Sequence, residues 1–203
     1  MRIISREALA ELPVRRYEGP VSLVTTLREL ADAREDFRGE RVVGLDTETR
    51  PSFKKGEVYL PCLVQAATAR AVYLFQLSRL EVFPALAELL ASPSVVKAGV
   101  GIANDTLQLK KVFPLTVENA LDLGVVARRR GLGQSGVRNL AGMLLGFRIP
   151  KGNRTSNWAA PRLSPAQITY AATDAWACRE LYLKFESEGL LAGVPVGDAS
   201  VRS

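Results

Sequence analysis

The sequence contains no histidine among its 203 residues. Histidine is the commonest general base near neutral pH, the usual zinc ligand in enzymes, and the partner that activates serine and cysteine nucleophiles. Its absence excludes active sites that depend on histidine in any of these three roles. Any catalysis must therefore use carboxylates, tyrosine, lysine or a bound metal ion.

Cysteines and long apolar runs are also scarce. Of the two cysteines, Cys62 lies in an apolar run typical of a strand and Cys178 in an apolar helix, so each is interpreted as a small buried side chain. No segment approaches the roughly 18 uninterrupted apolar residues of a membrane span, and the first residues lack the apolar core of a secretory signal. A membrane protein is excluded, and we expect a cytoplasmic protein.

The residues that are present are typical of one globular domain. The apolar fraction is 47%, and 27 lysines and arginines against 21 acids give a net charge of +6, which favours a polyanionic partner without identifying one. Residues 1–20 and 191–203 are weakly patterned. We therefore expect an N-terminal arm, a domain over residues 21–190 and a flexible C-terminal tail.

The hydrophobic periodicity predicts an α/β fold with a mixed sheet flanked by helices. Strands are expected at 42–46, 62–67 and 71–75, which would form a meander, and at 95–99, with a polar loop at 50–57. Helices are expected at 84–90, 104–112, 123–130 and 137–145. A longer helix is expected to begin after an N-cap at Ser164 and to reach about residue 188.

The strand at 42–46 leads into Asp46-Thr47-Glu48. Side chains alternate between the two faces of a strand, so Asp46 and Glu48 share one face. Two ionised acids after an apolar run are costly unless a cation or solvent meets them. Taken alone, the pair also fits a strand that simply emerges into solvent.

The long C-terminal helix contains Tyr170 and Asp174, which lie on one face a single turn apart because they are four residues apart. Small neighbours such as Ala171 and Ala175 would let this helix approach other backbone closely. Taken alone, the pair also fits an ordinary amphipathic helix.

Asp105 follows a glycine-containing turn between a strand and a helix. An acid in the first turn of a helix is favourable for the helix dipole, so a capping role would also explain it. The glycines here lack the spacing of a dinucleotide-binding fingerprint.

These three motifs occur in a recognisable order: Asp-x-Glu on a strand, Asp at a strand-to-helix turn, and Tyr-x-x-x-Asp on a C-terminal helix. The order resembles that of the DEDD superfamily of 3′-5′ exonucleases, in the branch that carries a tyrosine and includes ribonuclease D and the exonuclease domain of the Werner syndrome protein. The resemblance covers residues 42–182. Intervening segments resemble the Werner-type members too, namely residues 50–53, 99–102, 139–141, 156–158 and 170–175.

The resemblance implies a ribonuclease H-like fold and a two-metal-ion site for Mg²⁺ or Mn²⁺. Asp46 would bridge both ions, Glu48 and Asp174 would hold the ion that activates the attacking water, and Asp105 would help to hold the other, partly through water. Tyr170 would orient the water. An all-oxygen ligand set suits these hard ions.

Substrate contacts are expected at several further positions. Lys151 and Arg154 lie in a basic loop that either closes on phosphates of the substrate or is a solvated surface loop. Trp158 either stacks on a base or packs into the core. The resemblance also implies that backbone groups around Thr47 and Glu48 contact the terminal nucleotide, because family members hold the 3′ end beside the first motif. Residues 128–130 are a basic patch or charges suited to a helix C-terminus. Leu107 departs from relatives that carry tryptophan there.

The favoured function is a 3′-5′ exonuclease that acts on DNA, as in DNA repair, and releases nucleoside 5′-monophosphates. Trimming of RNA 3′ ends, as by ribonuclease D, is the alternative from the same superfamily. A non-catalytic nucleic-acid-binding module is the alternative from another class, and it would require one of the four acids to be missing. The sequence identifies no helicase or other protein partner.

Overall fold

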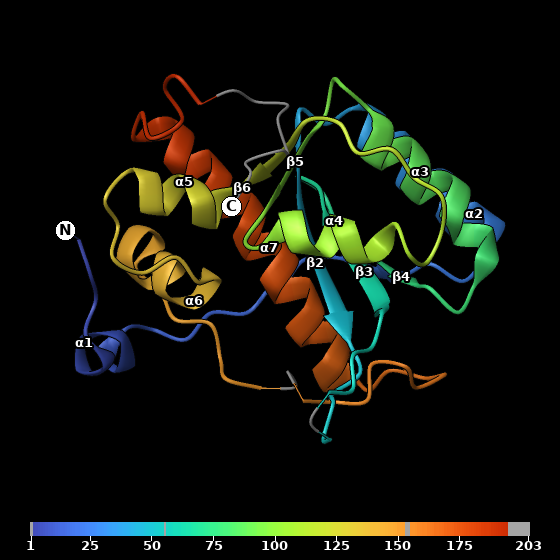
Figure 1. The fold of residues 1–203 in the computed structure, drawn as a ribbon, viewed down its shortest axis with the longest axis horizontal. Helices are drawn as coiled ribbons and strands as arrows, with labels where there is room; N and C mark the ends of the chain where they lie inside the picture. The colour runs from blue at the N-terminus through green and yellow to red at the C-terminus, as the bar shows by residue number, and fades with distance from the viewer. Residues whose placement is uncertain (1, 55, 153–154, 195–203) are drawn as a thin grey trace.

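The computed structural model describes residues 2–54, 56–152 and 155–194. In these ranges one mixed sheet of six strands has the order β1-β4-β3-β2-β5-β6 (Figure 1). The three strands β2, β3 and β4 form the antiparallel meander that the sequence predicts, and the other pairings are parallel. The strands are β1 (Val21–Leu23), β2 (Val42–Thr49), β3 (Pro61–Ala67), β4 (Val72–Gln76), β5 (Val96–Gly99) and β6 (Ala120–Asp122).

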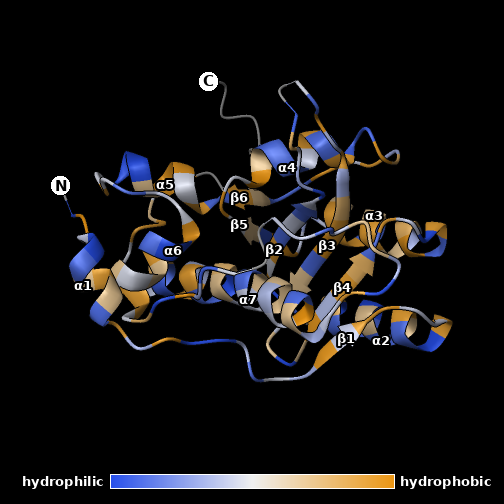
Figure 2. Cartoon of the chain, turned by 90° about the horizontal axis from the view of Figure 1, so that it is seen from below, coloured by the Kyte–Doolittle hydropathy of each residue, from blue (hydrophilic) through white to orange (hydrophobic). Residues whose placement is uncertain are grey.

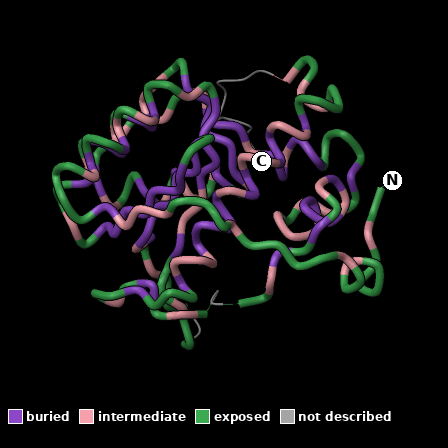
Figure 3. The backbone as a smooth tube through the Cα atoms, turned by 180° about the vertical axis from the view of Figure 1, so that it is seen from behind, coloured by how far each residue is buried: buried purple, intermediate pink, exposed green. Residues whose placement is uncertain are grey.

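Helices cover both faces of the sheet, which confirms the predicted α/β class. One face packs on α2 (Leu27–Arg38), on α3 (Phe83–Ala91), which follows the short 3-10 helix η1 (Leu80–Val82), and on α4 (Ile102–Leu109). The other face packs on α5 (Leu123–Arg129), α6 (Val137–Leu140) and the long α7 (Pro165–Ser187). Buried residues accordingly concentrate in the sheet between these layers (Figure 3).

Three helical segments differ from the sequence prediction. The weakly patterned arm contains α1 (Arg6–Glu11), and α2 was not predicted either, although Thr26 and Glu29 form the capping box that begins it. The helix expected at 137–145 is α6 followed by a π-helical segment, η2 (Ala141–Leu145), which ends at Gly146 with φ +72°. A wider turn and a left-handed residue thus interrupt the regular 3.6-residue period there.

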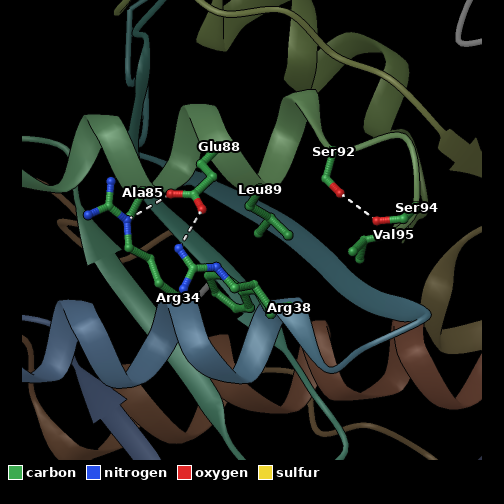
Figure 4. Close-up of a pocket in the computed structure, with 9 residues that line it drawn as sticks. Arg34, Arg38, Ala85, Glu88, Leu89, Ser92, Ser94 and Val95 are labelled. Carbon is green, nitrogen blue, oxygen red and sulfur yellow. Dashed lines mark hydrogen bonds and ion pairs between the residues drawn. The ribbon is translucent and has the colours of Figure 1, made fainter.

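Two ion pairs join α2 to α3 on the face of the sheet opposite α7. Arg34 Nε lies 2.9 Å from Glu88 Oε2, and Arg38 Nη2 lies 3.2 Å from Glu88 Oε1 (Figure 4). Because these side chains are partly exposed, solvent screens the pairs and their contribution to stability is small. The cationic ends here are already paired with a carboxylate, so this part of the surface has little free charge to offer a ligand.

The N-terminal arm is attached to the rest of the domain by backbone hydrogen bonds. Arg148 N donates to Pro13 O at 2.9 Å, and Arg15 N donates to Arg148 O at 3.1 Å. Tyr17 N then donates to the hydroxyl of Thr173 on α7 at 3.0 Å. The arm therefore crosses α7 at the residue that precedes Asp174.

The remaining sequence expectations have mixed outcomes. Neither cysteine forms a disulfide bond. Cys178 is buried, as predicted, but Cys62 is only partly buried. Within the described ranges, no helix combines the length and apolarity needed to cross a membrane. Most of the predicted C-terminal tail, residues 195–203, lies outside the described residues.

Candidate active site

The first acidic pair lies where β2 leaves the core of the sheet. β2 is buried through Leu45, and Asp46 and Glu48 then project from one face, as strand alternation predicts. Asp174 on α7 faces them, and one carboxylate oxygen from each of the three residues lies within 4.8 Å of the others. The structure thus brings together acids that are 126 residues apart in the sequence, from 48 to 174.

Close packing of α7 on β2 produces this juxtaposition. A Cβ atom at Gly44 would lie 2.1 Å from Ala175 O and 2.6 Å from Arg179 N, so only glycine fits between the strand and the helix. Ala171, Ala172 and Ala175 are fully buried against the sheet. The small residues therefore set how closely the carboxylate of Asp174 approaches those of β2. Figure 2 shows α7 lying against the sheet beside β2 and β3.

Tyr170 and Asp174 interact directly across one turn of α7. The Tyr170 hydroxyl donates a hydrogen bond to the Asp174 carboxylate, and burial together with this carboxylate raises the pKa of Tyr170. Tyr170 consequently keeps its proton at neutral pH. It can orient a neighbouring group through its hydroxyl but is not a base.

The carboxylates crowd one another in a site that excludes much of the solvent. Burial, followed by the charges of Asp174, Glu48 and Asp105, raises the pKa of Asp46 well above its ordinary value. Burial also raises the pKa of Asp174 to about 6. Among the described residues, Asp174 Oδ1 is buried without a hydrogen-bond partner. These oxygen donors, one of them unsatisfied, fit a hard divalent cation such as Mg²⁺ or Mn²⁺.

Asp105 stands apart from this three-residue cluster. It lies in the first turn of α4, which packs on the opposite face of β2 from α7. The Thr47 side chain, which projects from that face, hydrogen-bonds the Asp105 carboxylate, while burial raises the pKa of Asp105 to about 6. Asp105 still contributes to the electrostatic potential at Asp46. The charge of the fourth acid thus acts on Asp46, although its carboxylate is not one of the three that meet within 4.8 Å.

The sequence of this chain matches a known protein family. A family model described as 3′-5′ exonuclease matches residues 21–189. The chain belongs to this family. The bifunctional 3′-5′ exonuclease/ATP-dependent helicase WRN of Mus musculus is 36% identical over 160 residues, which cover 75% of this exonuclease and 11% of the mouse protein. Ribonuclease D of Gluconacetobacter diazotrophicus is 35% identical over 184 residues, which cover 86% of this exonuclease and 45% of that protein.

The exonuclease thus spans less than half the length of each of these two relatives. Solved structures agree on the fold. The Nibbler EXO domain of Aedes aegypti superposes with a TM-score of 0.74 at 22% identity, covering 90% of this chain and 94% of that one. RNase D of Escherichia coli superposes with a TM-score of 0.70 at 23% identity, and the superposition covers 84% of this chain and 46% of that one. The mixed sheet flanked by helices is therefore common to all three.

The expected role of Trp158 as a stacking residue for a base is wrong, because its side chain is fully buried. The ring packs instead against Tyr170 of the exonuclease, with centroids 5.9 Å apart at an angle of 41°. Trp158 therefore supports the ring of Tyr170 from the core. An aromatic residue just before a helix commonly packs inward, so the sequence already offered this alternative.

The basic loop before α7 is only partly described. Lys151 is exposed, and the next residue, Gly152, lies close to the ring of Tyr170. Arg154 lies outside the described residues. Arg128 and Arg129 lie in the last turn of α5 and Arg130 is its C-cap, as the helix-terminus alternative predicts. Arg130 Nε also donates to Leu190 O at 2.8 Å. Leu107 is 60% exposed on α4. It carries an apolar side chain without an aromatic ring, two residues after Asp105.

Two arginines that the sequence did not single out also lie near α7. Arg138 donates to Pro150 O, and its charge partly offsets the rise in the pKa of Asp174 that burial causes. Arg16, from the N-terminal arm, lines the same cavity as Tyr170 and Thr173. No local motif marks either residue, because their positions depend on how α6 and the arm pack against α7.

Proposed function

We propose that this exonuclease hydrolyses the 3′-terminal phosphodiester bond of a polynucleotide with two divalent metal ions, releases nucleoside 5′-monophosphates, and favours DNA. The observation that carries the proposal is the meeting of Asp46, Glu48 and Asp174 within 4.8 Å, with the Tyr170 hydroxyl bonded to Asp174. Such crowding of partly buried carboxylates is unfavourable without cations. The three oxygen ligands therefore support a metal site.

The positions of the residues support the roles that the family resemblance implies for them. Asp46, Glu48 and Asp174 would hold the metal, with Asp105 contributing from beyond Thr47. Divalent ions at such a site supply Lewis acidity that activates the attacking water and stabilises the leaving 3′ oxygen. Tyr170, protonated and fixed by Asp174, would orient the water for in-line attack. Trp158 would keep the Tyr170 ring in place.

The direct test compares Asp46→Asn and Asp174→Asn with Asp32→Asn, which removes an exposed acid on α2. A polynucleotide labelled at its 5′ end is incubated with Mg²⁺, Mn²⁺ or EDTA, and the products are separated by length. We expect a ladder of shortening products for the parent and for Asp32→Asn with metal, and none for the two site variants. Digestion by Asp174→Asn at the parent rate would contradict the proposed mechanism.

Thermal unfolding provides a second measurement that does not depend on turnover. Mg²⁺ or Mn²⁺ binds the folded state, so it should raise the melting temperature of the parent and of Asp32→Asn. The rise in melting temperature should be much smaller for Asp46→Asn, which loses one of the three clustered carboxylates. An equal rise in all three proteins would place the ions elsewhere.

The preference for DNA rests on Ser156-Asn157-Trp158, which resembles the Werner-type members, and on the mouse relative. The ribonuclease D relatives favour trimming of RNA as the second candidate. Matched DNA and RNA oligonucleotides, single- and double-stranded, separate the two. A higher kcat/KM for the DNA would support the first candidate, and a higher value for the RNA would replace it with the second.

A further inference from the structure

A basic groove extends from Tyr170 along the N-terminal arm. The first cavity, of about 350 Å³, lies between Tyr170 and the arm and contains Arg16 and Lys151. The second, of about 700 Å³, shares Arg16, Ile149, Pro150 and Lys151 with the first and continues between α1 and α6. Shared lining makes the two cavities continuous. We call this continuous surface the arm groove.

Positive charge dominates the arm groove. Its cationic residues come from four separate parts of the chain, and no aspartate or glutamate lines either cavity in the part of the chain that the structure describes. Like charges brought together repel one another, which is a cost unless an anion binds between them. The cationic residues are Arg6, Arg16, Arg138, Arg148 and Lys151.

These side chains retain unused hydrogen-bond donors. Among the described residues none of the five forms an ion pair with an acid. Arg138 donates to Pro150 O and Arg148 Nε to Leu12 O at 3.1 Å, which leaves further N–H groups on each guanidinium. The groove therefore presents several charged donors that a phosphate can accept from.

The arm holds Arg16 in a defined place. Arg15 N donates to Arg148 O at 3.1 Å on one side of it, and Tyr17 N donates to Thr173 Oγ1 at 3.0 Å on the other. Thr173 immediately precedes Asp174 on α7. The backbone of Arg16 is thus anchored to the catalytic helix before any ligand binds, which reduces the entropy lost on binding.

We propose that the arm groove binds the phosphates of the polynucleotide upstream of its 3′-terminal nucleotide, so that the N-terminal arm extends the substrate-binding surface of this exonuclease. The proposal rests on the proposed function. The continuous lining leads from Tyr170, beside the acids, to Arg6 on α1. A strand with its 3′ end at the acids can therefore continue past Arg16 and Lys151 to Arg6. Phosphate contacts of this kind are independent of base sequence.

The test uses Arg6→Gln/Arg16→Gln, because neither side chain makes a described hydrogen bond or ion pair and the change should leave the fold intact. Its matched control is Arg28→Gln/Arg129→Gln, which also removes two exposed charges but lines neither cavity. Kinetics are measured on a trinucleotide and on a 20-nucleotide strand, each labelled at the 5′ end, over a series of salt concentrations. Thermal unfolding of each variant checks the fold.

For Arg6→Gln/Arg16→Gln we expect the ratio of kcat/KM on the 20-nucleotide strand to that on the trinucleotide to fall on the order of tenfold. The slope of log KM for the longer strand against log salt should also become shallower, by about 1 to 1.5. The control pair should keep the parent's ratio and slope. An unchanged ratio and slope in Arg6→Gln/Arg16→Gln would overturn the arm groove as a binding surface.

The outcome is distinguishable from a failure of the proposed function. If the parent digests neither substrate with Mg²⁺ or Mn²⁺, the proposed function has failed, and the arm groove as its extension fails with it. If the parent digests both and the two arginine pairs behave alike, the function stands and only the arm groove is wrong.

Discussion

Tyr170 donates a hydrogen bond to the carboxylate of Asp174, one turn further along α7. The bond fixes the tyrosine hydroxyl beside the acidic cluster, and Trp158 packs against the ring from the core. Tyr170→Phe keeps the ring and removes only the hydroxyl. We expect kcat to fall on the order of 10²-fold with little change in KM, because the hydroxyl acts on the water and not on substrate binding.

The matched control for this prediction is Tyr182→Phe. It removes a hydroxyl from the same helix but nearer its C-terminal end, away from the acids, where Tyr182 interacts with Arg41. Steady-state kinetics on a labelled oligonucleotide should show parent values for the control. A large rise in KM with kcat preserved in Tyr170→Phe would instead assign the hydroxyl to substrate binding.

Gln65 is paired directly opposite Asp46 in the β2–β3 ladder. It is fully buried, and neither polar atom of its side chain has a hydrogen-bond partner among the described residues. A buried amide without partners is costly, so Gln65→Leu should raise the free energy of unfolding by about 1–2 kcal/mol in EDTA. Urea unfolding monitored by circular dichroism measures the change.

Gln76, on the neighbouring strand β4, provides the contrast. It is also buried, but its amide donates to Ala160 O at 3.0 Å. Gln76→Leu should therefore lower the free energy of unfolding by about 1 kcal/mol. If Gln65→Leu is destabilising as well, the Gln65 amide forms a hydrogen bond in solution, and Asp46 opposite it is the first residue to examine.

Lys97 on β5 is a fully buried cation whose Nζ donates to Ser92 O at 2.6 Å. Burial lowers its pKa from 10.5 to about 8. Between these values the unfolded chain holds the proton and the folded chain does not, so this residue makes the protein more stable as the pH rises from 8 towards 10.5. The gain is lost again as the pH falls through 8.

Lys97→Met should remove this part of the pH dependence. The stability of the parent relative to Lys97→Met should increase by about 3 kcal/mol between the two pKa values, as measured by urea unfolding at a series of pH values. Lys110→Met, which replaces an exposed lysine, should leave the profile unchanged. Parallel profiles for the parent and Lys97→Met would show that Lys97 keeps an ordinary pKa.

Gly44 determines how closely α7 approaches β2. A methyl group at this position would lie 2.1 Å from Ala175 O, which is backbone and cannot move alone. Gly44→Ala should therefore destabilise the protein by about 1–3 kcal/mol and reduce activity, since Asp174 would shift away from Asp46.

Gly136→Ala is the control, because nothing lies within 4 Å of the added methyl group and φ is −78°. It should be nearly neutral, since alanine restricts the unfolded chain but is a poorer N-cap for α6 than glycine. Thermal unfolding and kcat/KM on one oligonucleotide measure both effects. Full activity in Gly44→Ala would show that the site tolerates displacement of α7.

Local periodicity was sufficient for several predictions. Alternation along a strand placed Asp46 and Glu48 on one face, and the four-residue spacing placed Tyr170 one turn from Asp174. Ser164 and Pro165 correctly marked the start of α7. Thr26 and Glu29 form an equally local capping box, and it begins α2 outside the helices that the periodicity predicts.

Local spacing in the sequence thus predicts which residues share a strand face or a helix turn, because backbone geometry repeats every two or 3.6 residues. Which of these faces meet depends on how the elements pack in three dimensions. Packing at Gly44 brings Asp174 on α7 close to β2, the Thr47 side chain hydrogen-bonds Asp105, and Trp158 is buried. The tertiary structure also gathers Arg6, Arg16 and Arg148 into one groove. Such meetings depend on packing between segments far apart in the chain, for which local spacing carries no information.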